Sequence, residues 1–313
     1  MSVQEPIKSF LTDIEVSKAN NTYMTRRSDM RKFNQYLEEN DLDVLEAKTR
    51  HLHNWLRSQQ SEFSASTVQS RYHSLNQLYS YLSGILDQID ENPADGLNSV
   101  SEYASNGTLK HRGDSLSYVT PDEVALMAEG VDKPMIRNEL LIRLLFQTGM
   151  RRGELQSAKV ENIDRESRSI RIYAPKTDDH RTVFYRESLD FLLSQWLDVY
   201  REGQKKAVTS PYLFPTNSSE HISKERINRV VRAAAENAGI QEVVHHDAKG
   251  HPRYRVTAHA LRHGHAVHAL KSGVDIRSVA EHMGHNDIQT TMNYLQFVDD
   301  DVEEAYEQNW VTS

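Results

Sequence analysis

The sequence has 313 residues, a formal net charge of -8 and no cysteine. A chain of this length exceeds what one hydrophobic core usually fills, so we expect two domains. The absence of cysteine excludes disulfides, thiolate metal sites and thiol nucleophiles. A composition with 38% hydrophobic and 26% charged residues is typical of a soluble globular protein.

The charge and hydropathy patterns limit where the protein acts and how it could bind DNA. The most apolar run, Leu140 to Phe146, is short and contains Arg143, so no membrane span is expected. The first ten residues lack the basic start and apolar stretch of a secretory signal, so we expect a cytoplasmic location. Nonspecific DNA coating is disfavoured, because lysine and arginine supply most of that affinity. Any DNA binding must therefore use local basic patches.

The first 90 residues have the pattern of helices alone. Apolar residues at helical spacing form two stripes, and these are most simply core: Tyr23, Met30, Phe33 and Leu37, then Leu75, Leu78, Tyr79, Leu82 and Leu86. Basic side chains lie between and around the stripes, and we take four as candidate DNA contacts: Arg26, Arg27, Arg31 and Arg71. A solvated helix face would explain these charges equally well.

Breaker residues divide the chain. The segment 92–96, with the sequence NPADG, ends the helical block, and the polar stretch 101–117 has no periodicity. A new helix begins at Thr120, where Pro121 suits the first helical position and Glu123 completes a capping box. We predict a helical DNA-binding domain over residues 1–98, a linker over 99–117 and a second domain over 118–313.

The second domain mixes helices with a few strands. Three short, β-branched segments at 160–164, 168–173 and 181–185 predict a small antiparallel sheet after a strongly apolar helix. Helical patterns return from Arg226, interrupted by a turn-like stretch over 246–252. His245, His246 and His251 lie close together in sequence, but without cysteines we expect an exposed hairpin and no metal. The fold class is mainly α with a small antiparallel β-sheet.

Three short motifs could carry chemistry. Gly149 permits a tight turn from which Arg151 can project, although Arg151 with Glu154 could equally be a surface ion pair. His259 and Arg262 lie three residues apart, on one helical face near a helix N-terminus that favours an anion; a structural histidine is the alternative. His285 precedes Tyr294 by nine residues, and a lone tyrosine is ordinarily a packing residue.

Taken together, these motifs resemble those of the tyrosine recombinases, which include phage integrases and Xer resolvases. The family pattern is TG-x-R-xx-E-L, a lysine in a β-hairpin, H-x-L-R-H, L-G-H and TT-xx-Y. It is matched here, in order, by Thr148–Leu155, Lys176, His259–His263, Met283–His285 and Thr290–Tyr294. Two departures are small: Met283 replaces a leucine, and Ala258 stands where proline is common. The fragment 28–33 also resembles the family's helical core-binding domain.

The resemblance implies DNA cleavage and rejoining through a covalent bond between Tyr294 and a 3′-phosphate. Arg151 and Arg262 would hold the nonbridging oxygens bidentately, with no metal and no cofactor. Tyr294 would be the nucleophile, since a phenol is easier to deprotonate than an aliphatic alcohol. His259 would accept its proton, and His285 would donate to the phosphate or position the tyrosine.

The resemblance assigns two further roles. Lys176, at the family's lysine position in the turn between the second and third strands, would protonate the departing 5′-oxygen, although a surface lysine would also fit there. Glu154 would support Arg151 without reacting.

The architecture and partners also follow from the resemblance. We expect a two-domain clamp around double-stranded DNA and four protomers on two recombination sites, with an accessory directionality protein as a further candidate partner. Val302, Tyr306 and Trp310 give the C-terminus an apolar stripe that could dock into a neighbouring protomer or onto the chain's own core. The rival functions are a type IB topoisomerase-like relaxing enzyme and a catalytically silent DNA-binding regulator on the same fold.

Overall fold

The computed structural model describes residues 3–105, 117–174, 179–246, 250–285 and 287–298. The chain divides into two compact units, Met1–His111 and Arg112–Ser313, and each is considered by itself. Within the described ranges, no helix is long and apolar enough to cross a membrane.

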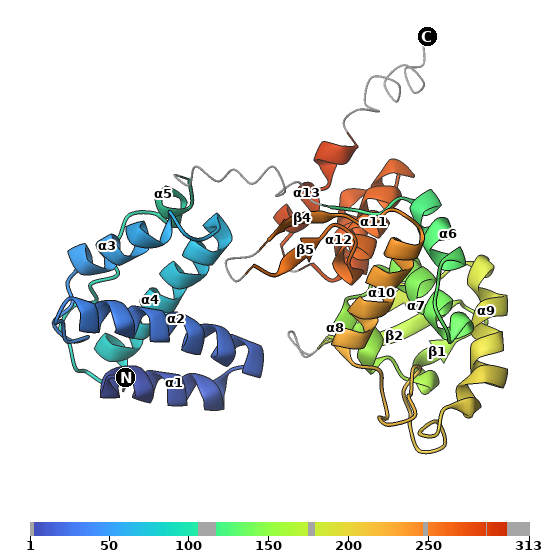
Figure 1. Ribbon diagram of the computed structural model, residues 1–313, viewed down its shortest axis with the longest axis horizontal. Coiled ribbons are helices and arrows are strands. Elements are labelled where there is room, and N and C mark those ends of the chain that lie inside the picture. Colours follow the sequence, from blue (N-terminus) through green and yellow to red (C-terminus); the bar gives the residue numbers. More distant parts are fainter. Residues whose placement is uncertain (1–2, 106–116, 175–178, 247–249, 286, 299–313) are drawn as a thin grey trace, which may run out of the picture. The chain divides into compact units, whose positions relative to one another are not determined.

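The first unit is all helical, as the sequence predicts (Figure 1). Its helices are α1 (Glu5–Ser17), α2 (Asn20–Glu39), α3 (Thr49–Gln59), α4 (Ala65–Gly84) and α5 (Val100–Ser105). The amphipathic stripes of α2 and α4 meet in one core, in which the Phe33 ring packs against Trp55 at 4.9 Å and against Tyr79 at 6.3 Å between ring centroids. The predicted stripes are confirmed as core, except that Tyr23 and Leu86 are only partly buried.

The helix α5 lies in the segment that the sequence assigns to the linker. Tyr103 from this helix is 2% exposed and belongs to the first unit's core, where its ring lies 5.9 Å from that of Tyr72. The first unit therefore continues beyond residue 98. The breaker residues at 92–96 mark a turn inside the unit, because Thr49 Oγ1 donates a hydrogen bond to the Pro93 carbonyl.

The second unit is built around α7 (Met135–Thr148), which lies among the surrounding helices in Figure 1. Its apolar residues, including Leu140, Leu141 and Leu145, are fully buried. The other helices are α6 (Pro121–Glu129), α8 (Arg152–Ser157), α9 (Asp190–Gln195), α10 (Lys224–Asn237), α11 (Ala258–Lys271), α12 (Ile276–Met283) and α13 (Gln289–Met292). The predicted capping box at the start of α6 is confirmed: Thr120 accepts from the Glu123 amide, and Glu123 accepts from the Thr120 amide.

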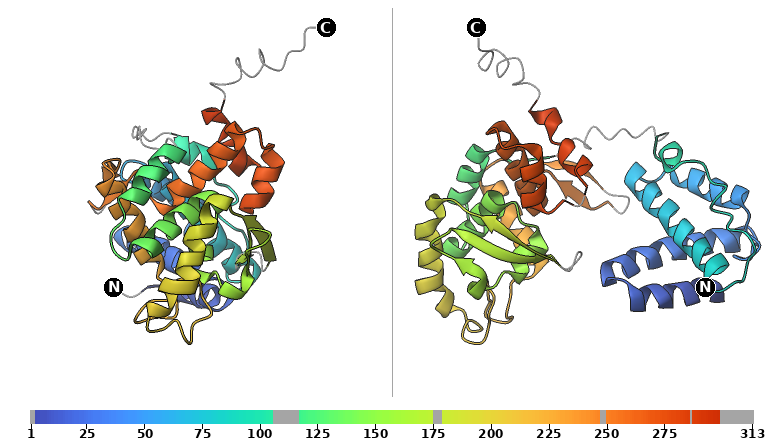
Figure 2. Two further views of the ribbon diagram at one scale, coloured as in Figure 1. Left: turned by 90° about the vertical axis from the view of Figure 1, so that its right-hand side faces the viewer. Right: turned by 180° about the vertical axis from the view of Figure 1, so that it is seen from behind.

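Two small antiparallel sheets complete the second unit. The first contains β1 (Ile163–Asp164), β2 (Ser169–Ala174) and β3 (Asp179–Phe184) in that order, seen from behind in Figure 2. The first predicted strand is shorter than expected, because residues 160–162 form a 3-10 turn. The second sheet pairs β4 (Val243–His246) with β5 (Pro252–Tyr254), so the histidine-rich stretch belongs to a hairpin.

The register of β2 and β3 fixes which side chains face the interior. Ile170 pairs with Val183 and Ile172 pairs with Arg181. Ile170, Ile172 and Val183 are at most 2% exposed. Arg181 lies two residues from Val183 and therefore shares its face of the strand. An arginine side chain is thus directed toward the covered side of the sheet.

Candidate active site

The turn between α7 and α8 presents Arg151 to solvent. Gly149 ends α7 in the left-handed region at a φ of 60°, and a Cβ there would lie 2.6 Å from His265 Cδ2. Glycine is therefore required both by the backbone and by its neighbour. Arg151 follows as the extended N-cap of α8, and its side chain is 45% exposed. This turn places a guanidinium at the surface with a defined backbone direction.

Arg262 is the second arginine of the site, and it is almost wholly buried. Its side chain extends from α11, where it is 2% exposed, and donates to the Gly149 carbonyl at 2.5 Å and to the Met283 carbonyl at 2.7 Å. Burial and the positive charge of Arg151 lower the pKa of Arg262 to about 9, which leaves the guanidinium charged at neutral pH. Arg262 thereby links the α7–α8 turn to the end of α12.

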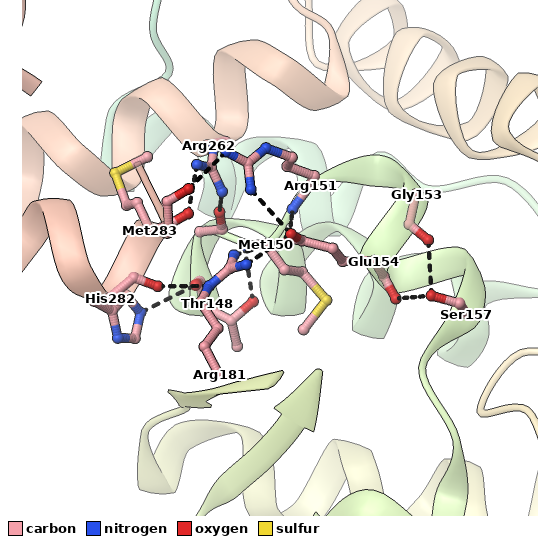
Figure 3. Close-up of polar contacts among 12 residues, drawn as sticks. Thr148, Met150, Arg151, Gly153, Glu154, Ser157, Arg181, Arg262, His282 and Met283 are labelled. Atoms are coloured by element: carbon pink, nitrogen blue, oxygen red, sulfur yellow. Dashed lines mark hydrogen bonds and ion pairs between the residues drawn. The ribbon is translucent and has the colours of Figure 1, made fainter. Parts of the chain in front are cut away.

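Glu154 lies beneath Arg151 and is 4% exposed (Figure 3). It accepts hydrogen bonds from the Arg151 amide at 2.5 Å and from Arg151 Nη1 at 3.1 Å. Arg181 Nη1 and Nη2 bind the two carboxylate oxygens at 2.7 and 2.9 Å. Burial alone would raise the pKa of Glu154, but the bonds to Arg181 and Arg151 outweigh it and hold the pKa below its ordinary value. The carboxylate is thus ionised and satisfied by two arginines.

The C-terminal end of α12 is capped by three arginines. Gly284 ends the helix in the left-handed region, at a φ of 65°. Three successive carbonyl oxygens at this end each accept a hydrogen bond from a different arginine. The His282 carbonyl accepts from Arg181 Nε at 2.9 Å. The Met283 carbonyl accepts from Arg262 Nη2 at 2.7 Å, and the Gly284 carbonyl accepts from Arg151 Nη2 at 2.9 Å. Cations are favourable at this negative end of a helix, whose last carbonyls have no partner within the helix. The guanidinium groups therefore gather immediately before His285.

His285 and Tyr294 lie next to each other after this helix end. His285 Nδ1 is 2.8 Å from Thr291 Oγ1, and its ring stacks on that of Tyr294 at 6.3 Å between centroids. Tyr294 is 3% exposed and packs in a small apolar cluster that includes Val267 and Met283. Burial raises the pKa of Tyr294, and Arg262 and Arg151 offset part of that effect. Burial together with the arginine charges lowers the pKa of His285 to about 4.

Two histidines of α11 extend the site. The His259 ring lies edge-on to His263 at 4.1 Å, and His263 lies edge-on to Tyr294 at 5.4 Å between centroids. Desolvation, followed by the charge of Arg262, lowers the pKa of His259. Burial likewise lowers the pKa of His263 to about 3. Both imidazoles are therefore neutral at physiological pH, which makes them acceptors or neutral donors rather than cations.

Comparison with known proteins identifies the family of this chain. Residues 117–300 match the phage integrase family, and residues 7–84 match the phage integrase N-terminal SAM-like domain. The chain belongs to the phage integrase family. Its fold is accordingly an N-terminal SAM-like core-binding domain followed by a mainly helical catalytic integrase domain with small antiparallel sheets. Proteins of this family are tyrosine recombinases, which break and rejoin DNA.

The relatives cover most of the chain. The tyrosine recombinase XerD of Agrobacterium fabrum is 28% identical over an alignment of 326 positions, which covers 95% of this chain and 91% of that protein. The tyrosine recombinase XerA of Pyrococcus furiosus is 30% identical over 217 residues, 68% of each chain. Among solved structures, the XerH recombinase bound to palindromic difH substrate has a TM-score of 0.72 at 22% identity, covering 96% of this chain and 82% of that one. This likeness concerns the fold.

The integrase domain brings together six residues singled out from the sequence: Arg151, Glu154, His259, Arg262, His285 and Tyr294. Lys176 lies outside the described residues. Sequence reasoning missed Arg181. Its signal in the sequence is weak: a second basic residue five positions after Lys176, at a place where the strand pattern directs it inward.

The four candidate DNA contacts of the SAM-like domain occupy different environments. Arg71 is 3% exposed, and its guanidinium stacks 3.8 Å from the centre of the Phe63 ring. Arg26 is partly buried and donates to Ser74 Oγ at 2.7 Å. Arg27 is partly buried beside Tyr23, whereas Arg31 is exposed. The Arg71 side chain is thus covered within this unit, and DNA contact by each of the four arginines stays a prediction.

In the ranges that the structure describes, no three histidine or carboxylate side chains are grouped so that they could hold an ion.

Proposed function

We propose that this chain is a site-specific DNA recombinase that cleaves and rejoins double-stranded DNA through a covalent 3′-phosphotyrosyl bond at Tyr294. The observation that carries the proposal is the convergence of Arg151 and Arg262 on adjacent carbonyls of the segment 283–284, next to His285 and Tyr294. Two guanidinium groups beside a phenol suit an in-line displacement at a phosphodiester, because the negative charge that builds on the nonbridging oxygens meets fixed cations.

In this proposal, each strand is cleaved by a single displacement at phosphorus. The Tyr294 oxygen attacks phosphorus, a phosphotyrosyl bond forms, and the bond from phosphorus to the 5′-oxygen breaks. His259 accepts the phenolic proton, and Lys176 donates a proton to the departing 5′-oxygen. A 5′-hydroxyl from a second strand reverses the displacement, so the energy of the phosphodiester is conserved without ATP or a cofactor.

The burial and protonation of the Tyr294 phenol determine what cleavage requires. With 3% of its surface exposed and a raised pKa, the phenol is neutral and covered in the free protein. Attack on DNA therefore requires both a proton acceptor and a movement that uncovers the ring. The small cluster around Tyr294, which forms a unit distinct from the main core, is the part of the domain that this movement would change.

Two rival functions predict different products. A type IB topoisomerase-like enzyme would relax supercoiled DNA as a monomer, and the match to an N-terminal SAM-like domain favours a recombinase instead. A silent regulator on the same fold would bind DNA and form no covalent adduct, but the six grouped residues give no reason for such a loss.

The deciding experiment is covalent capture on DNA. The chain is incubated with a library of nicked duplexes with randomised arms, and protein-linked DNA is recovered and sequenced. We expect an adduct with the unmodified chain and none with Tyr294→Phe, which keeps the ring and DNA binding. Tyr118→Phe is the matched control, because Tyr118 packs against the same cluster. A protease-sensitive adduct with Tyr294→Phe would show that another residue is the nucleophile.

We further propose that four protomers assemble on two DNA sites in the cytoplasm, with the C-terminal segment 299–313 docking into the neighbouring protomer. An accessory directionality protein remains a candidate partner, and both domains contact the duplex. The segment lies outside the described residues, so the proposal rests on the apolar stripe Val302, Tyr306 and Trp310. Deleting 299–313 should preserve single-site binding and abolish the four-protomer complex in light scattering. Normal tetramer formation by the truncated chain would refute the exchange.

A further inference from the structure

Arg181 has no part in the displacement just described, yet its guanidinium donates two hydrogen bonds to Glu154 and one to the His282 carbonyl. We propose that Arg181 is a positioning residue for DNA cleavage, which holds Arg151 through Glu154 and fixes the end of α12 that leads to His285. This inference rests on the proposed function of the same site. Arg181 lies on β3 and binds Glu154 on α8 and the His282 carbonyl on α12, so it connects the sheet to the helix that Arg151 precedes and to the helix that His285 follows.

The first connection runs through the shared carboxylate of Glu154. Each of its oxygens accepts one bond from Arg181 and one from Arg151: Oε1 lies 2.7 and 3.1 Å from their Nη1 atoms, and Oε2 lies 2.9 Å from Arg181 Nη2 and 2.5 Å from the Arg151 amide. Without Arg181, a carboxylate that is 4% exposed would keep only the bonds to Arg151. The carboxylate would then reorient toward Arg151 or toward solvent, and either change moves the Arg151 guanidinium.

The second connection is to the end of α12. Arg181 Nε donates to the His282 carbonyl at 2.9 Å, adjacent to the carbonyls that bind Arg262 and Arg151. A Cβ on Gly284 would lie 2.9 Å from Arg181 Nη1, so the guanidinium is packed directly against the turn that precedes His285. Arg181 therefore limits where that turn, and with it the following imidazole, can lie.

The geometry requires arginine rather than a positive charge alone. The guanidinium uses all three nitrogens: Nη1 and Nη2 bind the Glu154 carboxylate, and Nε binds the His282 carbonyl. Its planar fork presents these donors in fixed directions, whereas a lysine ammonium is a single point on a flexible stem. Lysine can neutralise Glu154, but it cannot reproduce the bidentate pair together with the carbonyl bond. An Arg181→Lys variant therefore distinguishes the two roles: it keeps the positive charge but loses the directed hydrogen bonds.

The first test is Arg181→Lys, which retains the charge beside Glu154. Single-turnover cleavage of a captured nicked duplex should slow by about 10²-fold, as expected when a catalytic group is misplaced by about 1 Å. The DNA dissociation constant should change little. Arg165→Lys is the matched control, because Arg165 forms a bidentate pair with Asp198 at 2.9 and 2.6 Å on an exposed surface. That control should cleave at the normal rate.

The second test removes both charges in Glu154→Gln/Arg181→Met, which leaves no unpaired buried ion. The reference is Glu154→Gln alone, because Glu154 also binds Arg151. If Arg181 only compensates the charge of Glu154, the double variant folds and cleaves at least as fast as Glu154→Gln, and that result overturns the proposal. If Arg181 positions the site through the His282 carbonyl as well, the double variant folds and cleaves more slowly than Glu154→Gln alone. Cleavage by Arg181→Lys within about threefold of the unmodified chain also overturns it. Failure of the unmodified chain to form any adduct would instead reject the proposed function.

Discussion

The imidazole of His263 lies edge-on against the ring of Tyr294, with the ring centroids 5.4 Å apart and the planes at 87°. Among the described residues, neither buried ring nitrogen of His263 has a hydrogen-bond partner. Burial and the nearby His259 and Arg262 lower the pKa of His263 to about 3, so the ring is neutral. A buried polar group without a partner lowers the stability of a fold, and such groups persist mainly at functional sites.

Replacing His263 with leucine should therefore separate stability from activity. The His263→Leu protein should unfold at a higher temperature, with a gain of about 1 kcal/mol, because leucine has no polar atoms to desolvate. Cleavage should fall by roughly 10-fold, the equivalent of about 1.4 kcal/mol, since leucine cannot hydrogen-bond the tyrosine or the phosphate. Thermal denaturation at pH 8 and single-turnover cleavage measure the two effects. A loss of stability with normal cleavage would contradict the prediction.

Gly149 offers a test of the turn that presents Arg151. Gly149→Ala places a Cβ in the left-handed region and 2.6 Å from the His265 ring. Gly273 also has a positive φ, of 83°, but a Cβ there meets nothing within 4 Å. Gly273→Ala should cost about 1 kcal/mol of unfolding free energy from backbone strain alone, and Gly149→Ala should cost about 1–3 kcal/mol more. Urea denaturation compares them, and equal losses would mean that the contact with His265 relaxes freely.

Periodicity and motif order were enough to predict much of this molecule. Met30, Phe33 and Leu37 are fully buried because an amphipathic helix must cover its apolar stripe, and the stripe is visible in the sequence. The capping box at Thr120 was predictable for a similar reason, since its donors and acceptors are local. The grouping of Arg151 with Tyr294 depended on the family resemblance, because the two lie 143 positions apart in the chain.

Side-chain partners across long separations were not predictable. Arg181 meets Glu154 across 27 positions and His282 across 101, and no local pattern records either contact. Arg71 looked like the other basic residues of the first unit, yet it is buried beneath Phe63. Periodicity distinguishes the apolar face of a helix from its polar face. A long side chain with an apolar stem and a charged tip can lie on either face, so its burial does not follow from the pattern.

Lys176 was assigned from the sequence and lies outside the described residues, so its role needs a chemical test. Lys176→Ala should slow cleavage of ordinary DNA by roughly 10² or more, as expected for loss of a general acid. A substrate with a sulfur in place of the 5′-oxygen should be cleaved by the variant at nearly the normal rate, because a thiolate leaves without a proton. Equal defects on both substrates would place the acid elsewhere.

His265 and His282 predict how stability depends on pH. Their rings stack at 5.0 Å between centroids; His265 Nδ1 donates to the Phe146 carbonyl at 2.9 Å, and His282 Nε2 donates to the Thr148 carbonyl at 3.1 Å. Burial and the neighbouring His282 lower the pKa of His265 to about 3, whereas an unfolded histidine has a pKa near 6.5. Between these values the unfolded chain binds a proton that the folded chain excludes.

Stability should therefore fall as the pH is lowered through this window, and it should be insensitive to His265 above about pH 7. Between pH 7 and 5.5, His265 alone should account for about 1 kcal/mol of the loss, and in this range most carboxylates remain ionised. His265→Gln keeps a donor for the Phe146 carbonyl and removes the titration, so its unfolding free energy should decline less steeply over the same range. Urea denaturation at half-unit pH intervals measures both slopes. Parallel slopes for the two proteins would show that His265 is protonated in the folded state, and the pH dependence would then have to come from the other histidines around Arg262.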